Sequence, residues 1–212
     1  MYSHVIFDLD GTLIDSAPSI LKCLKLALSQ NKIDPIIPLT YKIIGPPLDV
    51  TLKKVTGISD SLIVNNLIDC FKEAYDRNGY KASVPYHGIA EMLERLSVSG
   101  IQIHLATNKR IAPTKKILEY FSWDLFFNSV YALDVGDVKF KSKAEMLASI
   151  VKEKNLGSFN ALYVGDINAD YEAAQKSEMQ FIFAEWGYEK KGDFQYLFSA
   201  SDAEDLTQKI LG

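Results

Sequence analysis

Apolar runs of strand length recur along this chain, and this pattern is the feature that most limits the folds it can adopt. The runs lie at 4–9, 101–106, 128–133, 160–164 and 180–184, and helical segments separate them from residue 101 onwards. Strands that alternate with helices predict a parallel sheet with helices packed on it. We therefore expect an α/β fold in which the polar residues at the strand ends share one edge of the sheet.

Between residues 17 and 83 the pattern is helical throughout. Apolar side chains recur at helical spacing in 18–31 and 60–77, and a shorter helix is expected at 47–56. We expect an all-helical cap domain at 17–83, inserted into a core domain made of 1–16 and 84–212. The loop Gly45-Pro46-Pro47-Leu48 is either a rigid loop that faces the strand edge or an ordinary turn between helices.

Charge and composition favour a small-molecule partner. The chain has 212 residues, of which 48% are hydrophobic, and a formal net charge of -4. Nucleic acids and anionic membranes call for a basic surface, so neither is an expected partner, and we expect a small metabolite and a monomer or weak dimer. Cys23 and Cys70 lie in amphipathic stretches without metal-ligand spacing, which predicts buried apolar residues. With no leader or long apolar run, a cytoplasmic location is expected.

Two carboxylates stand directly behind the first apolar run, in the sequence Asp8-Leu9-Asp10-Gly11-Thr12. Strand alternation places Asp8 and Asp10 on the same side and Leu9 on the opposite face. At ~4 Å two such charges repel by roughly 1 kcal/mol in water and by about 4 kcal/mol at an effective dielectric constant near 20. A hard divalent cation or one shared proton would offset this repulsion.

Three further places carry polar residues at or near expected strand ends. They are Thr107-Asn108, a lysine near the start of the helix at 143–154, and Gly165-Asp166 with Asp170 four residues on. Each has an ordinary interpretation, as a helix cap, a solvated charge or a turn. Together with Asp8 and Asp10, they indicate a site that binds an anion and a metal ion and carries an attacking carboxylate.

These motifs resemble those of the haloacid dehalogenase superfamily of phosphohydrolases. The resemblance rests on 7–13, Thr107, a downstream lysine and Gly165-Asp166-x-x-x-Asp170. The helical insert, the 44–48 loop and 85–88 are similar to the phosphoglycolate phosphatase-like and β-phosphoglucomutase-like branch. The resemblance implies a Rossmann-like parallel sheet flanked by helices, with an inserted helical cap. Ile167 and His87 depart from residues common in relatives, and neither change removes a required group.

For chemistry, the resemblance implies a nucleophile and one residue that acts first as an acid and then as a base. Asp8 attacks phosphorus and forms an aspartyl phosphate, and Asp10 protonates the leaving alcohol and later activates water. Asp8, the backbone carbonyl of Asp10 and Asp166 are expected to hold Mg²⁺, while Asp170 ligates through water or orients that shell.

Phosphoryl oxygens are expected to bind a second group of residues at the same edge. This group comprises the backbone N–H groups of Leu9 and Asp10, Thr107, the Asn108 backbone and one lysine. Lys139, Lys141 and Lys143 lie close together in the sequence. Ser142-Lys143-Ala144-Glu145 predicts a capping box, with Lys143 in the first helical turn, and we therefore favour Lys143. Lys141 is the rival because its spacing to Glu145 also resembles that of relatives.

The function expected from these features is Mg²⁺-dependent hydrolysis of a small phosphate monoester, such as phosphoglycolate. A phosphomutase of the β-phosphoglucomutase type is the first alternative, since it would use the same residues. A dehalogenase has no use for Asp10 or Asp166. A phosphoacceptor signalling domain would be shorter and lack the insert, and a non-catalytic binding protein would be expected to tolerate loss of one element. The sequence leaves open which ester is the substrate.

Overall fold

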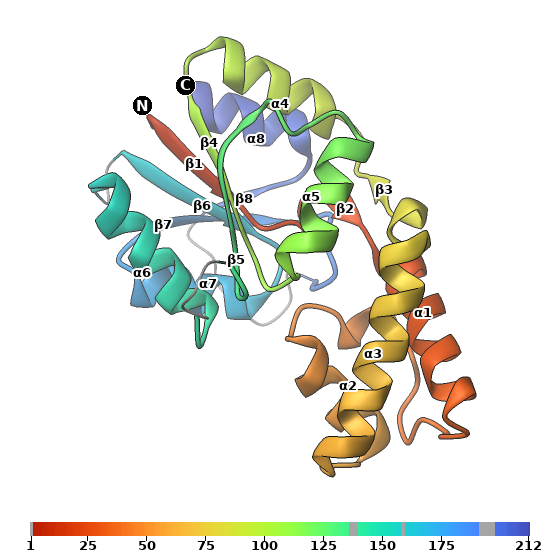
Figure 1. Cartoon of the computed structure of the whole chain (residues 1–212). Coiled ribbons are helices and arrows are strands. Elements are labelled where there is room, and N and C mark those ends of the chain that lie inside the picture. Colours follow the sequence, from red (N-terminus) through yellow and green to blue (C-terminus); the bar gives the residue numbers. More distant parts are fainter. Residues whose placement is uncertain (1, 136–139, 158–159, 191–197) are drawn as a thin grey trace. The chain divides into compact units, whose positions relative to one another are not determined.

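A computed structural model of the chain describes residues 2–135, 140–157, 160–190 and 198–212. The chain divides into two compact units (Figure 1), which we call the sheet unit (Met1–Asp15 and Pro85–Gly212) and the helical unit (Ser16–Val84). None of the described helices combines the length and the apolar character that crossing a membrane requires.

The sheet unit contains a parallel sheet, which confirms the predicted α/β class. In the part of the chain that the structure describes, six strands follow the order β5-β4-β1-β6-β7-β8. They are β1 (His4–Phe7), β4 (Gln102–Thr107), β5 (Phe127–Ala132), β6 (Ala161–Gly165), β7 (Gln180–Ala184) and β8 (Ser199–Ala200). Both neighbours of β1 are parallel to it, with Phe7 opposite Leu105 and Val164. The central strands are buried on both faces, which explains their continuous apolar sequences.

Helices cover both faces of this sheet. α4 (Ile89–Val98) and α8 (Ala203–Leu211) lie together on one face, and α6 (Lys143–Lys154) and α7 (Asn168–Lys176) on the other (Figure 1). α5 (Ile111–Tyr120) packs against β5. Under α6 and α7, Ile6, Tyr163 and Phe183 pack with Leu147 and Ile150 in one buried cluster. The direction of the strand order reverses at β1, and ligands of α/β sheets bind beside such a reversal, at the carboxyl ends of the strands.

The predicted strands match the observed ones to within two residues at each end. The structure adds β8 and two short strands, β2 (Ile14–Asp15) and β3 (Val84–Pro85), which pair with each other. Each of these added strands has only two residues. A segment of that length carries no alternation that a sequence pattern could reveal.

The helical unit contains α1 (Ala17–Gln30), α2 (Leu48–Thr56) and α3 (Ser61–Arg77), with short 3-10 turns at Tyr41–Ile43 and Gly79–Ala82. These helices agree with the segments predicted from helical spacing. α1 packs along α3, and the Asp60 side chain caps α3 by accepting the Leu62 and Ile63 backbone N–H groups. Of the two cysteines, Cys23 is buried as expected, whereas Cys70 is only half-buried.

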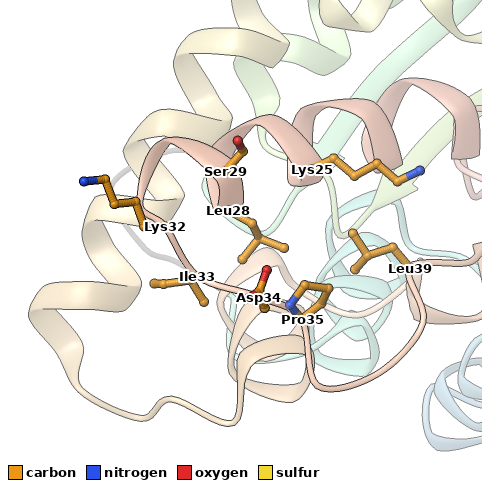
Figure 2. Close-up of a pocket in the computed structure, with 8 residues that line it drawn as sticks. All are labelled: Lys25, Leu28, Ser29, Lys32, Ile33, Asp34, Pro35 and Leu39. Carbon is orange, nitrogen blue, oxygen red and sulfur yellow. The ribbon is translucent and has the colours of Figure 1, made fainter.

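An open hollow of about 640 Å³ lies on the helical unit beside the end of α1 (Figure 2). Its lining residues are Lys25, Leu28, Ser29, Lys32, Ile33, Asp34, Pro35 and Leu39. The two lysine side chains extend outward from it in the view of Figure 2. It contains none of the residues that the sequence predicts for catalysis.

Two histidines meet on neighbouring strands of the sheet unit. The His4 Nδ1 and His104 Nε2 atoms lie 3.0 Å apart, and His104 Nδ1 lies 2.6 Å from the Ser129 hydroxyl oxygen. Burial first, and then His4 and Lys154, lower the pKa of His104 from its ordinary value of 6.5 to about 4. The folded protein therefore holds His104 neutral, with both ring nitrogens in polar contacts.

This arrangement predicts a loss of stability in mild acid. Because the pKa of His104 is lower in the folded chain than in the unfolded chain, its contribution is complete above pH 6.5 and declines as the pH falls toward 4. Between pH 7 and pH 5 the loss is about 2 kcal/mol at most. Urea unfolding at both pH values should show a smaller loss for His104→Asn than for the wild type. The exposed His87, changed to asparagine, serves as control, and equal losses in all three proteins would contradict this assignment.

Candidate active site

Asp8, the first carboxylate of the site, directly follows β1. The strand is anchored on both sides, and the Asp8 backbone N–H continues its pairing with β6 by donating to the Val164 carbonyl at 2.9 Å. The Asp8 side chain is 7% exposed. Leu9 is fully buried, and its carbonyl accepts the Leu13 and Ile14 N–H groups, which turns the chain sharply after the strand.

Gly11 permits this turn because it has a φ of +92° and lies against the next carboxylate. A Cβ atom at this position would lie 2.1 Å from Asp166 Oδ2. The neighbouring Thr12 hydroxyl donates to Asp166 Oδ1 at 3.0 Å. The turn after β1 and the end of β6 are therefore in direct contact, which brings residues 154 positions apart in the sequence into one site.

A matched pair of glycine substitutions tests this contact. Gly100 also has a positive φ, of +79°, but a Cβ there would meet nothing within 4 Å. Gly100→Ala should therefore lose only the cost of backbone strain, about 1 kcal/mol, whereas Gly11→Ala should lose at least ~2 kcal/mol more because the Asp166 carboxylate must move. Urea unfolding measures both values. Similar losses for the two variants would show that the carboxylate has room to shift.

The end of β6 and the start of α7 supply two more carboxylates, Asp166 and Asp170, neither of which is exposed. Asp166 Oδ2 accepts the Tyr188 backbone N–H at 2.8 Å. Asp170 Oδ2 accepts the Asp166 N–H at 3.2 Å and the Ile167 N–H at 3.4 Å, while its Oδ1 accepts the Tyr163 hydroxyl at 3.0 Å. Both oxygens of Asp170 are thus engaged by the protein.

Lys143 reaches two of the site's carboxylates, Asp8 and Asp170, from the first turn of α6. Its Nζ lies 2.8 Å from Asp8 Oδ1 and 2.6 Å from Asp170 Oδ1, and its side chain is 8% exposed. Burial lowers the pKa of Lys143, but Asp170 and Asp8 raise it more strongly, so that it lies above its ordinary value. Lys143 is therefore held as an ammonium group between the two carboxylates.

The rival lysine points elsewhere. The Lys141 side chain is exposed, and its backbone N–H donates to Glu145 Oε2 at 2.5 Å. The predicted capping box is therefore formed in part: Ser142 Oγ accepts the Glu145 N–H at 3.2 Å, but Glu145 binds the N–H of Lys141. Lys139 lies outside the described residues.

Thr107 is the last residue of β4 and Asn108 follows it, at the same edge of the sheet. Thr107 is buried, and its Oγ1 accepts the Lys109 backbone N–H at 3.1 Å, while Asn108 is half-buried. Lys109 itself was not predicted from the sequence. Its Nζ lies 3.0 Å from Asp10 Oδ2, and its side chain is 8% exposed, so it belongs to the site.

Other residues that the sequence did not predict hold residues of the site in place. Tyr163 fixes Asp170, and the Trp186 indole N–H donates to the Thr12 carbonyl at 2.9 Å. Gly187 approaches Asp166 so closely that a Cβ would lie 2.2 Å from the Asp166 Cβ. The only sequence signal for this segment is its place after a strand, together with a glycine, and many loops share both features.

The charges of the site are unbalanced in a way that fits a divalent cation. Among the described residues, four carboxyl groups (Asp8, Asp10, Asp166 and Asp170) lie in the site, and the ammonium groups of Lys109 and Lys143 contact three of them. Full ionisation would leave two negative charges in excess. Burial, opposed by Lys143, raises the pKa of Asp8 to about 7. Burial, and then the charges of Asp170 and Asp8, raise the pKa of Asp166 well above its ordinary value.

The carboxylates are also close enough to share an ion. Asp8, Asp166 and Asp170 each offer a ligand oxygen, and these oxygens lie within 4.8 Å of one another. Hard oxygen ligands suit Mg²⁺ or Ca²⁺. The donor set, its burial and its excess charge therefore fit a divalent metal ion.

Comparison with known proteins identifies what the chain is similar to. A family model described as haloacid dehalogenase-like hydrolase matches residues 5–184. The phosphoglycolate phosphatase of Aquifex aeolicus is 30% identical over 207 residues, which are 96% of this chain and 94% of that protein. The tyrosine-protein kinase PtkA of Mycobacterium tuberculosis is 29% identical over 87% of this chain, and the match spans 62% of that kinase. The crystal structure of a predicted phosphatase from Clostridium acetobutylicum has a TM-score of 0.88 at 27% identity, covering 100% of this chain and 99% of that one.

Proposed function

Because the chain belongs to the haloacid dehalogenase-like hydrolase family, we propose that it is a Mg²⁺-dependent phosphohydrolase that cleaves small phosphate monoesters. The observation that carries this proposal is the position of Asp8, which directly follows the central strand β1, contacts Lys143 and lies close to two more carboxylates, Asp166 and Asp170. A carboxylate so placed can attack a phosphoryl group whose negative charge the lysine and a metal ion neutralise.

In the first step an Asp8 oxygen bonds to phosphorus and the bond from phosphorus to the alcohol oxygen breaks. Asp10 gives its proton to that oxygen, which avoids expulsion of an alkoxide. In the second step water attacks the aspartyl phosphate, Asp10 accepts the water proton, and phosphate leaves Asp8. One difficult displacement is thereby divided into two easier ones.

Charge neutralisation is assigned to Lys143, to the phosphoryl-binding groups and to Mg²⁺. Asp8, the Asp10 backbone carbonyl and Asp166 would hold the ion, which neutralises charge on the phosphoryl oxygens when bound. Asp170 is assigned to the outer shell, because each of its oxygens already accepts two hydrogen bonds, one of them from the Lys143 ammonium group, whereas each Asp166 oxygen accepts one from the described residues. Lys143, Thr107 and the N–H groups of Leu9, Asp10 and Asn108 are assigned to the phosphoryl oxygens.

Phosphoglycolate is the first substrate to test, because the phosphoglycolate phosphatase of Aquifex aeolicus is similar over nearly the whole chain. Sugar phosphates, nucleoside monophosphates and phosphotyrosine belong in the same panel. The measurement is phosphate release from each ester in the presence of Mg²⁺. Multiple turnovers on at least one ester support the proposal, whereas release that stops at one equivalent would indicate a phosphoacceptor protein. Conversion of a sugar phosphate into its positional isomer without phosphate release would identify a phosphomutase.

A further inference from the structure

The second lysine of the site, Lys109, has no role in the mechanism above. It directly follows Thr107-Asn108, and its Nζ lies 3.0 Å from Asp10 Oδ2. The Lys109 side chain is 8% exposed and the Asp10 side chain 13% exposed. Lysine is almost never buried to this degree unless it is paired, because removing an ammonium group from water is costly. Lys109 is therefore a component of the site rather than a surface charge.

The two oxygens of Asp10 have different surroundings. Oδ2 is paired with Lys109, whereas Oδ1 is buried and has no hydrogen-bond partner among the described residues. A buried carboxylate oxygen without a partner is destabilising, and such atoms persist mainly where a site receives a group from outside. Oδ1 is thus the oxygen of Asp10 that an incoming molecule would contact.

We propose that Lys109 is a positioning residue for Asp10: it binds Oδ2 and so presents Oδ1 to the oxygen atoms that exchange a proton. This inference rests on the proposed phosphohydrolase function and assigns a cationic partner to its acid–base residue. Lys143 contacts Asp8 and Asp170, and Lys109 contacts Asp10, so that the nucleophile and the proton carrier each have their own lysine. A carboxyl group fixed in this way is already oriented for proton transfer, so it does not first have to lose rotamer freedom.

The proton balance assigns the same oxygen to both steps. In the first step the proton on Oδ1 passes to the alcohol oxygen as its bond to phosphorus breaks, and Asp10 becomes a carboxylate beside the Lys109 ammonium group. In the second step Oδ1 takes a proton from water as the water oxygen bonds to phosphorus. Lys109 keeps its own protons throughout and contacts no reacting atom in this scheme.

The alternative role for Lys109 is direct binding of the phosphoryl group, and the two roles differ in their dependence on the leaving group. A general acid matters greatly when an alkoxide must leave and little when a stable phenolate leaves. The ratio kcat/KM reports the steps up to release of the alcohol, so the later hydrolysis of the aspartyl phosphate does not affect it. A comparison of an alkyl phosphate with dinitrophenyl phosphate therefore separates the two roles.

In Lys109→Met, kcat/KM for the alkyl phosphate should fall about 100-fold, while kcat/KM for dinitrophenyl phosphate should fall less than about 5-fold. Since the second step also needs Oδ1, this variant should release a burst of dinitrophenolate before a slow steady state. Lys109→Arg, which keeps the charge, should recover most of the alkyl phosphate activity. Lys115→Met, at an exposed lysine of α5, is the matched control and should behave as wild type.

A double-mutant cycle completes the test, because a residue that acts through Asp10 has nothing to position once Asp10 is removed. Adding Lys109→Met to Asp10→Asn should lower kcat/KM for the alkyl phosphate less than about 3-fold further. Equal losses on both esters, or full additivity in the cycle, would overturn the inference and identify Lys109 as a phosphoryl ligand or a purely structural residue. Failure of the wild-type protein to hydrolyse either ester would instead contradict the proposed function.

Discussion

Replacing Asp8 with asparagine is expected to lower turnover of any ester substrate by at least about a thousandfold, because an amide neither attacks phosphorus nor forms the covalent intermediate. The measurement is steady-state phosphate release with Mg²⁺ present. Mass spectrometry of the wild-type protein, trapped with a slowly hydrolysed ester, should locate the phosphoryl adduct on the peptide that contains Asp8.

The fold of this variant should remain intact, which separates loss of chemistry from loss of structure. Burial raises the pKa of Asp8 to about 7, so the ionised carboxylate does not stabilise the metal-free protein. Lys143 also keeps Asp170 as a partner. The melting temperature of metal-free Asp8→Asn should therefore equal or exceed that of the wild type. Asp124→Asn, at an exposed position, is the control. If Asp8→Asn retained more than a tenth of the activity of this control, the nucleophile would have to be another residue.

Mg²⁺ is expected to stabilise the folded protein strongly, because it binds the buried acidic cluster and has no comparable site in the unfolded chain. At a hundredfold excess over the dissociation constant, the gain is ~2.7 kcal/mol. For a chain of this length, that corresponds to an increase in melting temperature of roughly 5–10 °C. Differential scanning calorimetry with and without millimolar Mg²⁺ measures it, and removal of the metal by a chelator should abolish turnover.

The size of this stabilisation should depend on pH. The pKa values of Asp8 and Asp166 are raised in the folded protein, for Asp8 to about 7, so without metal their ionisation destabilises it as the pH rises above about 4. Mg²⁺ removes this penalty, and its stabilising effect should be larger at pH 8 than at pH 5. Asp166→Asn should lose most of the effect. A melting curve that does not respond to Mg²⁺ at either pH would argue against a metal site in this cluster.

The sequence predicted the carboxylates of the site because their positions follow from strand ends. Asp8 and Asp166 stand directly after apolar runs, and parallel strands bring their carboxyl ends to one edge of the sheet. For Lys143 the prediction rested on the helix start at Ser142, and the structure shows its ammonium group between Asp8 and Asp170. The catalytic and metal-binding roles of these residues remain proposals.

What the sequence could not predict depends on the direction of single side chains. Lys109 lies in a loop, where no periodicity determines whether a lysine points to solvent or inward. Tyr163 belongs to a strand buried on both faces, so its apolar neighbours gave no sign that its hydroxyl binds Asp170. The contacts of Trp186, Gly187 and Tyr188 depend on tertiary structure alone.

The two glycines that lie against the Asp166 side chain also limit which residues can replace Asp166. Gly11 and Gly187 approach its side chain from the turn after β1 and from the segment after β7, and a Cβ atom added to either glycine would lie within 2.2 Å of an Asp166 side-chain atom. Glutamate differs from aspartate by one methylene group, so it should be excluded here on size although it keeps the charge. In a saturation library this position should therefore accept no other acid, and its tolerance should widen only when a neighbouring backbone shifts as well.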